Sequence, residues 1–143
     1  MSDAPLDPDG LSTDDLSTDD ARRAAGMRTR REVLGDAWVD RAVAGTTPFT
    51  AGFQDFITRV AWGDIWQRPG LERRERSIAT LSICIALRHW DEFALHVRAA
   101  VHNGLSEDEI AEVVQHAAVY AGVPAANHAF KVAAGVLAEM REG

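Results

Sequence analysis

The sequence has little cysteine and little lysine, and it lacks any long uncharged apolar run. Cys84 is the one cysteine among 143 residues, so no internal disulfide can form, and its apolar surroundings (ATLSICIAL) indicate a small core residue. Lys131 is the one lysine, and the other basic side chains are arginines. No uncharged apolar stretch reaches about 18 residues, and the start MSDAPLDPDG has no basic segment followed by an apolar one. We therefore expect a soluble, cytoplasmic protein.

Basic residues are also missing from the first 20 positions, where negative charge is concentrated. This segment holds seven aspartates and a tandem repeat of LSTDD at residues 11–20. Because it buries little apolar surface and repels itself, we interpret residues 1–20 as a disordered acidic tail. The rest of the chain carries 15 acidic and 15 basic side chains. A neutral body argues against nucleic-acid binding, which needs a basic face.

Residues 21–143 are long enough for one domain with a core, and their apolar spacing predicts an all-α fold. Apolar residues recur at steps of three and four, and no segment alternates with a period of two. An arginine-rich, weakly amphipathic segment at residues 21–31 comes first. The helices that we expect to follow it cover residues 32–43, residues 48 to about 62, residues 71–87, residues 92–102, a segment from residue 106 to about residue 120, and a last segment from residue 124 onward.

Several start and stop signals support these boundaries. Thr47 before Pro48 is a suitable N-cap with proline at the first helical position. Asp91 can cap the helix that follows it, and Gly104 provides a left-handed stop. Residues 106–109 (SEDE) form a capping box, in which serine is followed three positions later by glutamate.

The stretch from residue 71 to residue 104 combines the longest apolar run with charged side chains. Its segment from Ile78 to Leu87 is uncharged on every face, which predicts a helix buried all round. The β-branched residues in it also allow a strand, but its length and lack of turn residues favour the helix. Arg73, Arg74 and Arg76 lie at the start of this helix, where the helix dipole disfavours cations. This placement suggests anion binding, although a solvated face remains the alternative.

Glu92 and His96 stand four residues apart, so their side chains share one face of a helix. His96 lies at the edge of the apolar face that contains Phe93 and Val97, where partial burial can tune its proton affinity. This spacing suits an acid/base pair, and a Glu/His pair at a subunit contact is the alternative. His89 extends the pattern to H-x-x-E-x-x-x-H, but a new helix starting at Asp91 separates it from the others, so we expect no metal site.

Trp62 and Trp66 are also four residues apart, just before the turn signal Pro69-Gly70. Such tryptophans serve as core or interface anchors, and the alternative is that one of them forms the wall of a pocket. The sequence contains no C-x-x-C motif, no G-x-S-x-G motif and no glycine-rich phosphate loop.

The chain from Trp62 to about Ala138 resembles the carboxymuconolactone decarboxylase family, within the alkylhydroperoxidase-like superfamily. The resemblance depends on five short sequence motifs. No single motif is diagnostic, but the order and spacing of the motifs are specific. The motifs are WGDIWQRPGL at residues 62–71, R-x-R-S-I at 74–78, E-x-x-x-H at 92–96, NGLSEDEI at 103–110 and YAGVPAA at 120–126.

The peroxidase members of that superfamily have a C-x-x-C whose second cysteine lies four residues before a histidine. In this sequence His89 and Glu92 stand at the two cysteine positions, ahead of His96. Without both thiols, the disulfide that this redox chemistry requires cannot form, which favours the decarboxylase branch. The resemblance implies a helical bundle assembled as a homo-oligomer based on trimers, with a hexamer expected, and sites near subunit contacts.

The activity that the resemblance implies is cofactor-free decarboxylation of 4-carboxymuconolactone to the β-ketoadipate enol-lactone in protocatechuate catabolism. The partner is then a small lactone dicarboxylate. The alternative is a redox-partner or non-catalytic scaffold protein on the same fold. The site residues that we expect are catalytic His96 and Glu92 and substrate-binding Arg73, Arg76, Trp66 and Tyr120.

Overall fold

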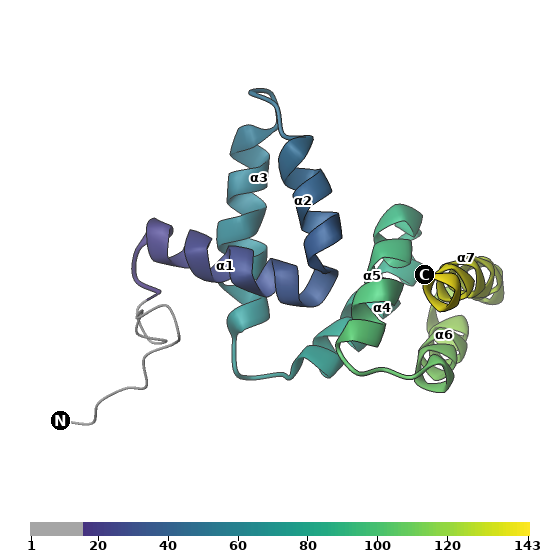
Figure 1. The fold of residues 1–143 in the computed structure, drawn as a ribbon. Coiled ribbons are helices and arrows are strands. Elements are labelled where there is room, and N and C mark those ends of the chain that lie inside the picture. The colour runs from purple at the N-terminus through teal and green to yellow at the C-terminus, as the bar shows by residue number, and fades with distance from the viewer. Residues whose placement is uncertain (1–15) are drawn as a thin grey trace. The chain divides into compact units, whose positions relative to one another are not determined.

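The computed structural model describes residues 16–143, and most of the expected acidic tail, residues 1–15, lies outside them. The described residues form seven α-helices and no strand, which confirms the all-α prediction (Figure 1). They divide into two compact units, residues 16–32 with 36–68 and residues 33–35 with 69–143. The division falls at the turn predicted for Pro69-Gly70, within the chain that we expected to form one domain. No helix among the described residues is long and apolar enough to cross a membrane.

The N-terminal unit contains α1 (Asp19–Leu34) except for its last two residues, together with α2 (Asp36–Ala44) and α3 (Ala51–Ile57). The single helix expected over residues 32–43 is wrong, because Gly35 adopts a φ of +88° and separates α1 from α2. The N-cap expected at Thr47 is also wrong. Residues 47–50 form a turn in which the Thr47 amide donates to Thr50 Oγ1 (3.0 Å), so α3 begins only at Ala51.

Two glycines allow α1 to approach the segment that follows α3. That segment consists of the π-helical η1 (Thr58–Trp62) and the 3₁₀-helical η2 (Ile65–Gln67). A Cβ at Gly26 of α1 would lie 2.0 Å from the Thr58 carbonyl oxygen, and one at Gly63 would lie 2.3 Å from the Arg22 carbonyl oxygen. The two backbones therefore touch, and α1 runs antiparallel to this segment.

We expect Gly26→Ala to destabilise the protein by about 3 kcal/mol, because the added methyl group forces two backbone segments apart. Gly52→Ala in α3 is the matched control, since a Cβ there meets nothing within 4 Å. Alanine has the higher helix propensity, so the control should be neutral or more stable by up to about 1 kcal/mol. Denaturant unfolding of both variants measures the difference. Equal stability would show that the close contact between α1 and η1 is not rigid.

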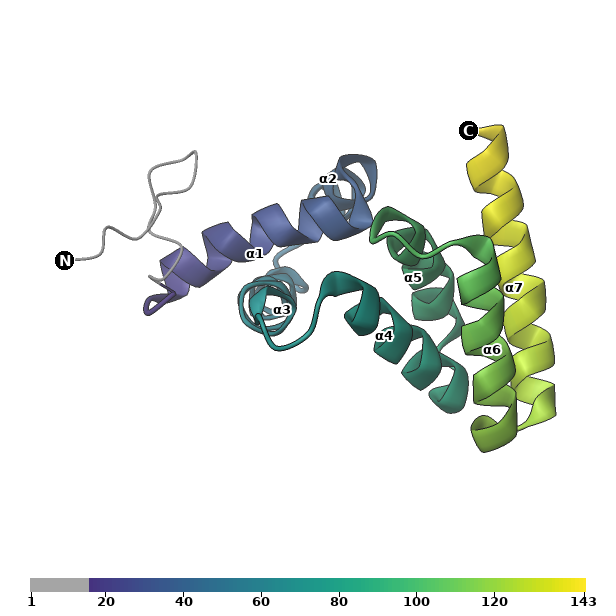
Figure 2. The same cartoon turned by 90° about the horizontal axis from the view of Figure 1, so that it is seen from below.

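The C-terminal unit contains α4 (Arg73–Leu87), α5 (Trp90–His102), α6 (Glu107–Ala121) and α7 (Val123–Glu142). Helices α4 and α5 pack against each other, and α6 lies alongside α7 (Figure 2). Full burial of each large apolar side chain contributes about 1.5–3 kcal/mol to folding. The largest fully buried apolar side chains of this core are Leu81, Ile85, Phe93, Val97, Ile110 and Val114.

Most predicted helix signals in this unit are confirmed. The Ser106 side chain accepts from the Glu109 amide, and the Glu109 side chain accepts from the Ser106 amide, which completes the capping box. Gly104 has a φ of +94°, and proline lies in the first turn of α7. The cap expected at Asp91 is wrong, because α5 begins at Trp90 and its N-cap is His89.

The prediction that residues 78–87 are buried all round is also wrong. Ile83 is 56 % exposed and Leu87 is 60 % exposed in the single chain, while Leu81 and Ile85 are fully buried. Only one side of α4 faces the other helices of the unit. Uniform hydrophobicity therefore did not distinguish a helix buried within one chain from a helix with an apolar outer face.

Candidate functional site

The turn between α4 and α5 determines which parts of the two helices face each other. Arg88 adopts the left-handed conformation, with a φ of 58°, and the His89 amide donates to the Cys84 carbonyl (2.9 Å). At the other end, Asn103 Nδ2 donates to Ser77 Oγ (2.9 Å). Since α5 therefore runs back along α4, His96 lies about level with the middle of α4.

His96 is more deeply buried than its position at the edge of the apolar face suggested. The residue is only 6 % exposed, and its Nε2 lies 3.9 Å from Glu92 Oε2. Glu92 itself is largely exposed, with 63 % of its side-chain surface accessible. Burial lowers the pKa of His96 to about 4, so its imidazole is neutral at neutral pH. The pair thus joins a shielded imidazole to a carboxylate that reaches solvent.

On α4, Cys84 is the residue whose thiol is affected by this pair. The cysteine is buried, as predicted, and burial followed by the charge of Glu92 raises the pKa of its thiol. Glu92 is therefore close enough to Cys84 for its charge to affect the thiol. Within residues 16–143, no three His, Cys, Asp or Glu side chains are placed to hold a metal ion.

The three arginines at the start of α4 have different surroundings. Arg74 Nη1 donates to the Gly104 carbonyl (2.6 Å), and its guanidinium forms an ion pair with Glu109 on α6, so Arg74 has a structural role. Arg73 and Arg76, on the same first turns of α4, are both half-buried. Steps of four residues lead from Arg76 through Thr80 to Cys84, near Glu92. Helical spacing therefore puts Arg76 on the same side of α4 as Cys84, whose thiol is affected by the charge of Glu92.

The two aromatic residues predicted to contact substrate occupy different units. Trp66 belongs to the N-terminal unit, where its ring stacks on buried Trp62 with centroids 5.3 Å apart. Tyr120, at the end of α6 in the C-terminal unit, is 81 % exposed, and its ring lies 5.2 Å from the His116 ring. The substrate-binding roles of both residues stay predictions.

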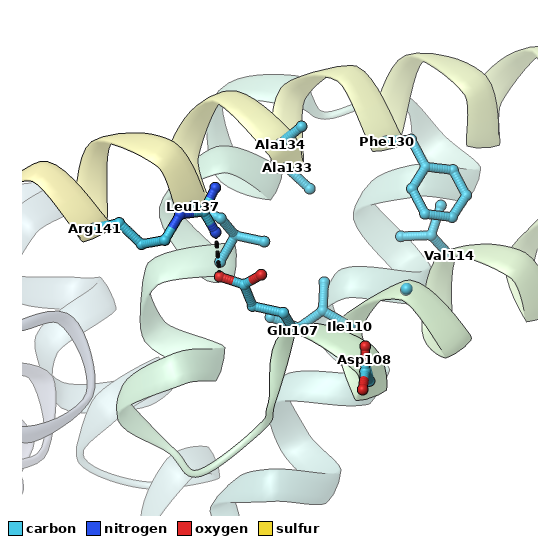
Figure 3. A pocket seen from close by; sticks show the side chains of 10 residues that line it. Glu107, Asp108, Ile110, Val114, Phe130, Ala133, Ala134, Leu137 and Arg141 are labelled. Carbon is cyan, nitrogen blue, oxygen red and sulfur yellow. Dashed lines mark hydrogen bonds and ion pairs between the residues drawn. The ribbon is translucent and has the colours of Figure 1, made fainter.

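A separate cavity of about 290 Å³ lies between α6 and α7 (Figure 3). Its floor is apolar and includes Ile110, Val114 and Phe130. At its rim Arg141 is already paired with Glu107, and Asp108 adds a second carboxylate. A dianionic ligand would meet net negative charge there, so this cavity suits the expected substrate less well than the α4–α5 side.

Arg30 of α1 is 5 % exposed, and no pattern in the sequence pointed to it. Its helix is rich in arginine, and apolar spacing there is weak, so spacing alone did not show which arginine would be buried. The feature that distinguishes Arg30 is the burial of its charged side chain, and this burial is known only from the folded chain.

Comparison with known proteins gives consistent matches over most of the chain. The model of the carboxymuconolactone decarboxylase family matches residues 51–135. A 4-carboxymuconolactone decarboxylase of Acinetobacter baylyi is 41 % identical over 122 residues, which cover 85 % of this chain and 91 % of that protein. A nitrosuccinic acid decarboxylase of Metarhizium robertsii is 50 % identical over 99 residues, covering 69 % of each chain. A 4-carboxymuconolactone decarboxylase of Pseudomonas putida is 54 % identical over 43 residues, covering 30 % of this chain and 90 % of that protein.

Proposed function

Because the chain belongs to the carboxymuconolactone decarboxylase family, we propose that it decarboxylates 4-carboxymuconolactone to the β-ketoadipate enol-lactone without a cofactor. The observation that carries this proposal is the buried His96 imidazole beside the Glu92 carboxylate. Titratable groups with strongly shifted pKa values are typical of catalytic sites. The relatives from Acinetobacter baylyi and Pseudomonas putida bear the name of this activity.

The proposed substrate contains its own electron sink. Its scissile carboxylate is attached to a ring carbon that is conjugated through a C=C bond to the lactone carbonyl. When the carbon–carboxylate bond breaks, CO₂ leaves and the electron pair moves through the ring onto the carbonyl oxygen. A proton then adds to the ring carbon next to that carbonyl. The protein must hold two carboxylates, stabilise the oxyanion and deliver the proton.

We assign these tasks to the predicted site residues. Arg73 and Arg76 hold the carboxylates, and His96, assisted by Glu92, delivers the proton. His96 is neutral in the free protein because burial lowers its pKa to about 4. Two substrate carboxylates nearby favour the charged imidazolium, so we propose that His96 takes up a proton when the substrate binds. Tyr120 or a backbone N–H group donates to the oxyanion, and the substrate-binding role of Trp66 stays a prediction.

We also propose that the protein works as a homo-oligomer based on trimers, with a hexamer expected. The support comes from apolar side chains that one chain leaves exposed. Besides Ile83 and Leu87, these include Val119, Tyr120 and Val123 around the end of α6, each more than 70 % exposed. In an assembly, exposed Tyr120 could reach a site in a neighbouring copy. Sedimentation of the full chain tests this proposal, and a monomer at assay concentration would reject it.

Arg76→Gln should raise KM for the lactone roughly 10- to 100-fold, because a lost charge-assisted hydrogen bond costs about 1.5–3 kcal/mol. We expect kcat to change less, since the arginine holds the carboxylate in ground and transition states alike. Arg98→Gln is the matched control, because Arg98 is an arginine of α5 that pairs with Glu139 at the surface. Steady-state kinetics of both variants measure the effect. If Arg76→Gln left KM unchanged, Arg76 would not belong to the site.

A second candidate substrate is nitrosuccinate, because the relative from Metarhizium robertsii is 50 % identical to this chain. Nitrosuccinate is also a dicarboxylate with a built-in electron sink, since its nitro group can accept the electron pair as a nitronate. The same arginines and histidine would then suit both reactions.

The experiment is to add purified protein to freshly generated 4-carboxymuconolactone, and separately to nitrosuccinate, in the presence of a chelator. CO₂ release is followed together with appearance of the enol-lactone or of the nitronate product. Rapid, chelator-insensitive release from the lactone would support the proposal, and release from nitrosuccinate alone would favour the second candidate. A folded, oligomeric protein that releases CO₂ from neither compound would favour the remaining alternative, a redox-partner or non-catalytic scaffold protein.

A further inference from the structure

The N-terminal unit contains a buried arginine whose hydrogen-bond partner is a neutral amide. Arg30 of α1 is 5 % exposed, and its Nη2 donates to Gln54 Oε1 of α3 (3.2 Å). Its Nε is fully buried and has no acceptor among residues 16–143. No carboxylate of the described chain forms an ion pair with it.

This lack of a carboxylate partner contrasts with five other arginines of the same unit. Arg31, the next residue, pairs with Asp36 and Asp40, although it is more exposed. A buried guanidinium without a counter-ion is costly, because it has lost its hydration without gaining an opposite charge. Burial, followed by the charge of Arg31, also lowers the pKa of Arg30. Further arginines of the unit that pair with aspartates are Arg22, Arg23, Arg59 and Arg68.

The position of Arg30 is fixed by the close packing of α1 on η1. Arg30 lies one helical turn after Gly26, whose missing side chain lets α1 touch the Thr58 carbonyl. Gln54 lies one turn before Thr58, and its own carbonyl accepts from Thr58 Oγ1 (2.8 Å). The backbones that carry Arg30 and Gln54 are therefore held together by contacts one turn away, which reduces the entropy lost when a ligand binds between the two side chains.

We propose that Arg30 and Gln54 form a binding site for a small carboxylate. The two oxygens of a carboxylate match the parallel N–H groups of a guanidinium, and Gln54 has an amide N–H group that can donate as well. One guanidinium beside a neutral amide offers N–H groups in one plane, which match the two coplanar oxygens of one carboxylate group better than the tetrahedral oxygens of phosphate. The site goes beyond the proposed reaction, because it needs neither turnover nor a particular substrate.

The test is a titration of the full chain with succinate, followed by NMR of the arginine Nε–H groups labelled with ¹⁵N. The Arg30 signal, assigned from its loss in Arg30→Met, should shift and saturate. Arg30→Met should weaken succinate binding, measured by calorimetry, by roughly 10-fold or more. It should also unfold at the same or a higher denaturant concentration, because it removes a buried charge without a counter-ion.

Matched variants separate a binding role from a structural role. Arg31→Met removes the more exposed neighbour and should keep the succinate shift of Arg30. Gln54→Met keeps the charge and should weaken binding less than Arg30→Met. An Arg30 signal that succinate leaves unmoved, or an Arg30→Met protein that is less stable but binds succinate normally, would overturn the proposal. A shift that inorganic phosphate produces at equal concentration would overturn the carboxylate assignment. Lactone turnover, whether present or absent, leaves this test unaffected.

Discussion

His96→Gln is expected to reduce turnover of the lactone by about 10²- to 10⁴-fold, which is the usual contribution of a positioned general acid. Glutamine retains a polar side chain of similar reach but cannot deliver a proton to the ring carbon. The loss should appear mainly in kcat, because the carboxylates are held by the arginines rather than by the imidazole. Steady-state kinetics at neutral pH, with circular dichroism and sedimentation to verify fold and assembly, measure this effect.

His128→Gln provides the control for this result. His128 is an exposed histidine of α7 whose ring packs on Trp90, with centroids 4.5 Å apart. Its replacement should leave turnover near that of the unchanged protein. If His96→Gln were folded, assembled and fully active, His96 would have no role in proton delivery, and the Glu92–His96 pair would be structural.

The second large effect concerns stability at acidic pH. The pKa of His96 is about 4 in the folded chain, compared with 6.5 for an unperturbed histidine, so the unfolded state takes up this proton first. The free energy of unfolding should therefore fall as pH falls from about 6.5 to about 4. The difference between the two pKa values corresponds to about 3 kcal/mol in total. Denaturant titrations at a series of pH values and one protein concentration measure this loss.

The comparison with His96→Gln isolates the histidine, because the variant should lack this loss above pH 4.5. His128→Gln should retain the loss. The carboxylate of Glu109 contributes in a lower range, since hydrogen bonding from Arg74 lowers its pKa to about 2, and this contribution declines below about pH 4.5. Parallel pH profiles for the unchanged protein and His96→Gln would show that His96 is not buried as the structure places it.

Local sequence signals predicted local structure well where one interaction decides the conformation. The capping box at residues 106–109, proline at the start of α7 and the positive φ of Gly104 each depend on neighbouring residues, and all three are confirmed. The predicted cap at Asp91 is wrong because the left-handed turn at Arg88 lets α5 begin at Trp90. The N-cap predicted at Thr47 is wrong for a similar reason, because the turn between Thr47 and Thr50 delays the start of α3.

The sequence by itself determined the helical class, most helix positions and the pairing of Glu92 with His96, because these follow from spacing along one helix. Only the tertiary structure decided the environments of charged and apolar side chains. It joined Arg74 to Glu109 across 35 positions, left Ile83 exposed and buried Arg30 against a neutral amide. Burial and long-range pairing depend on how helices pack, and packing is a property of several segments together that no single segment encodes.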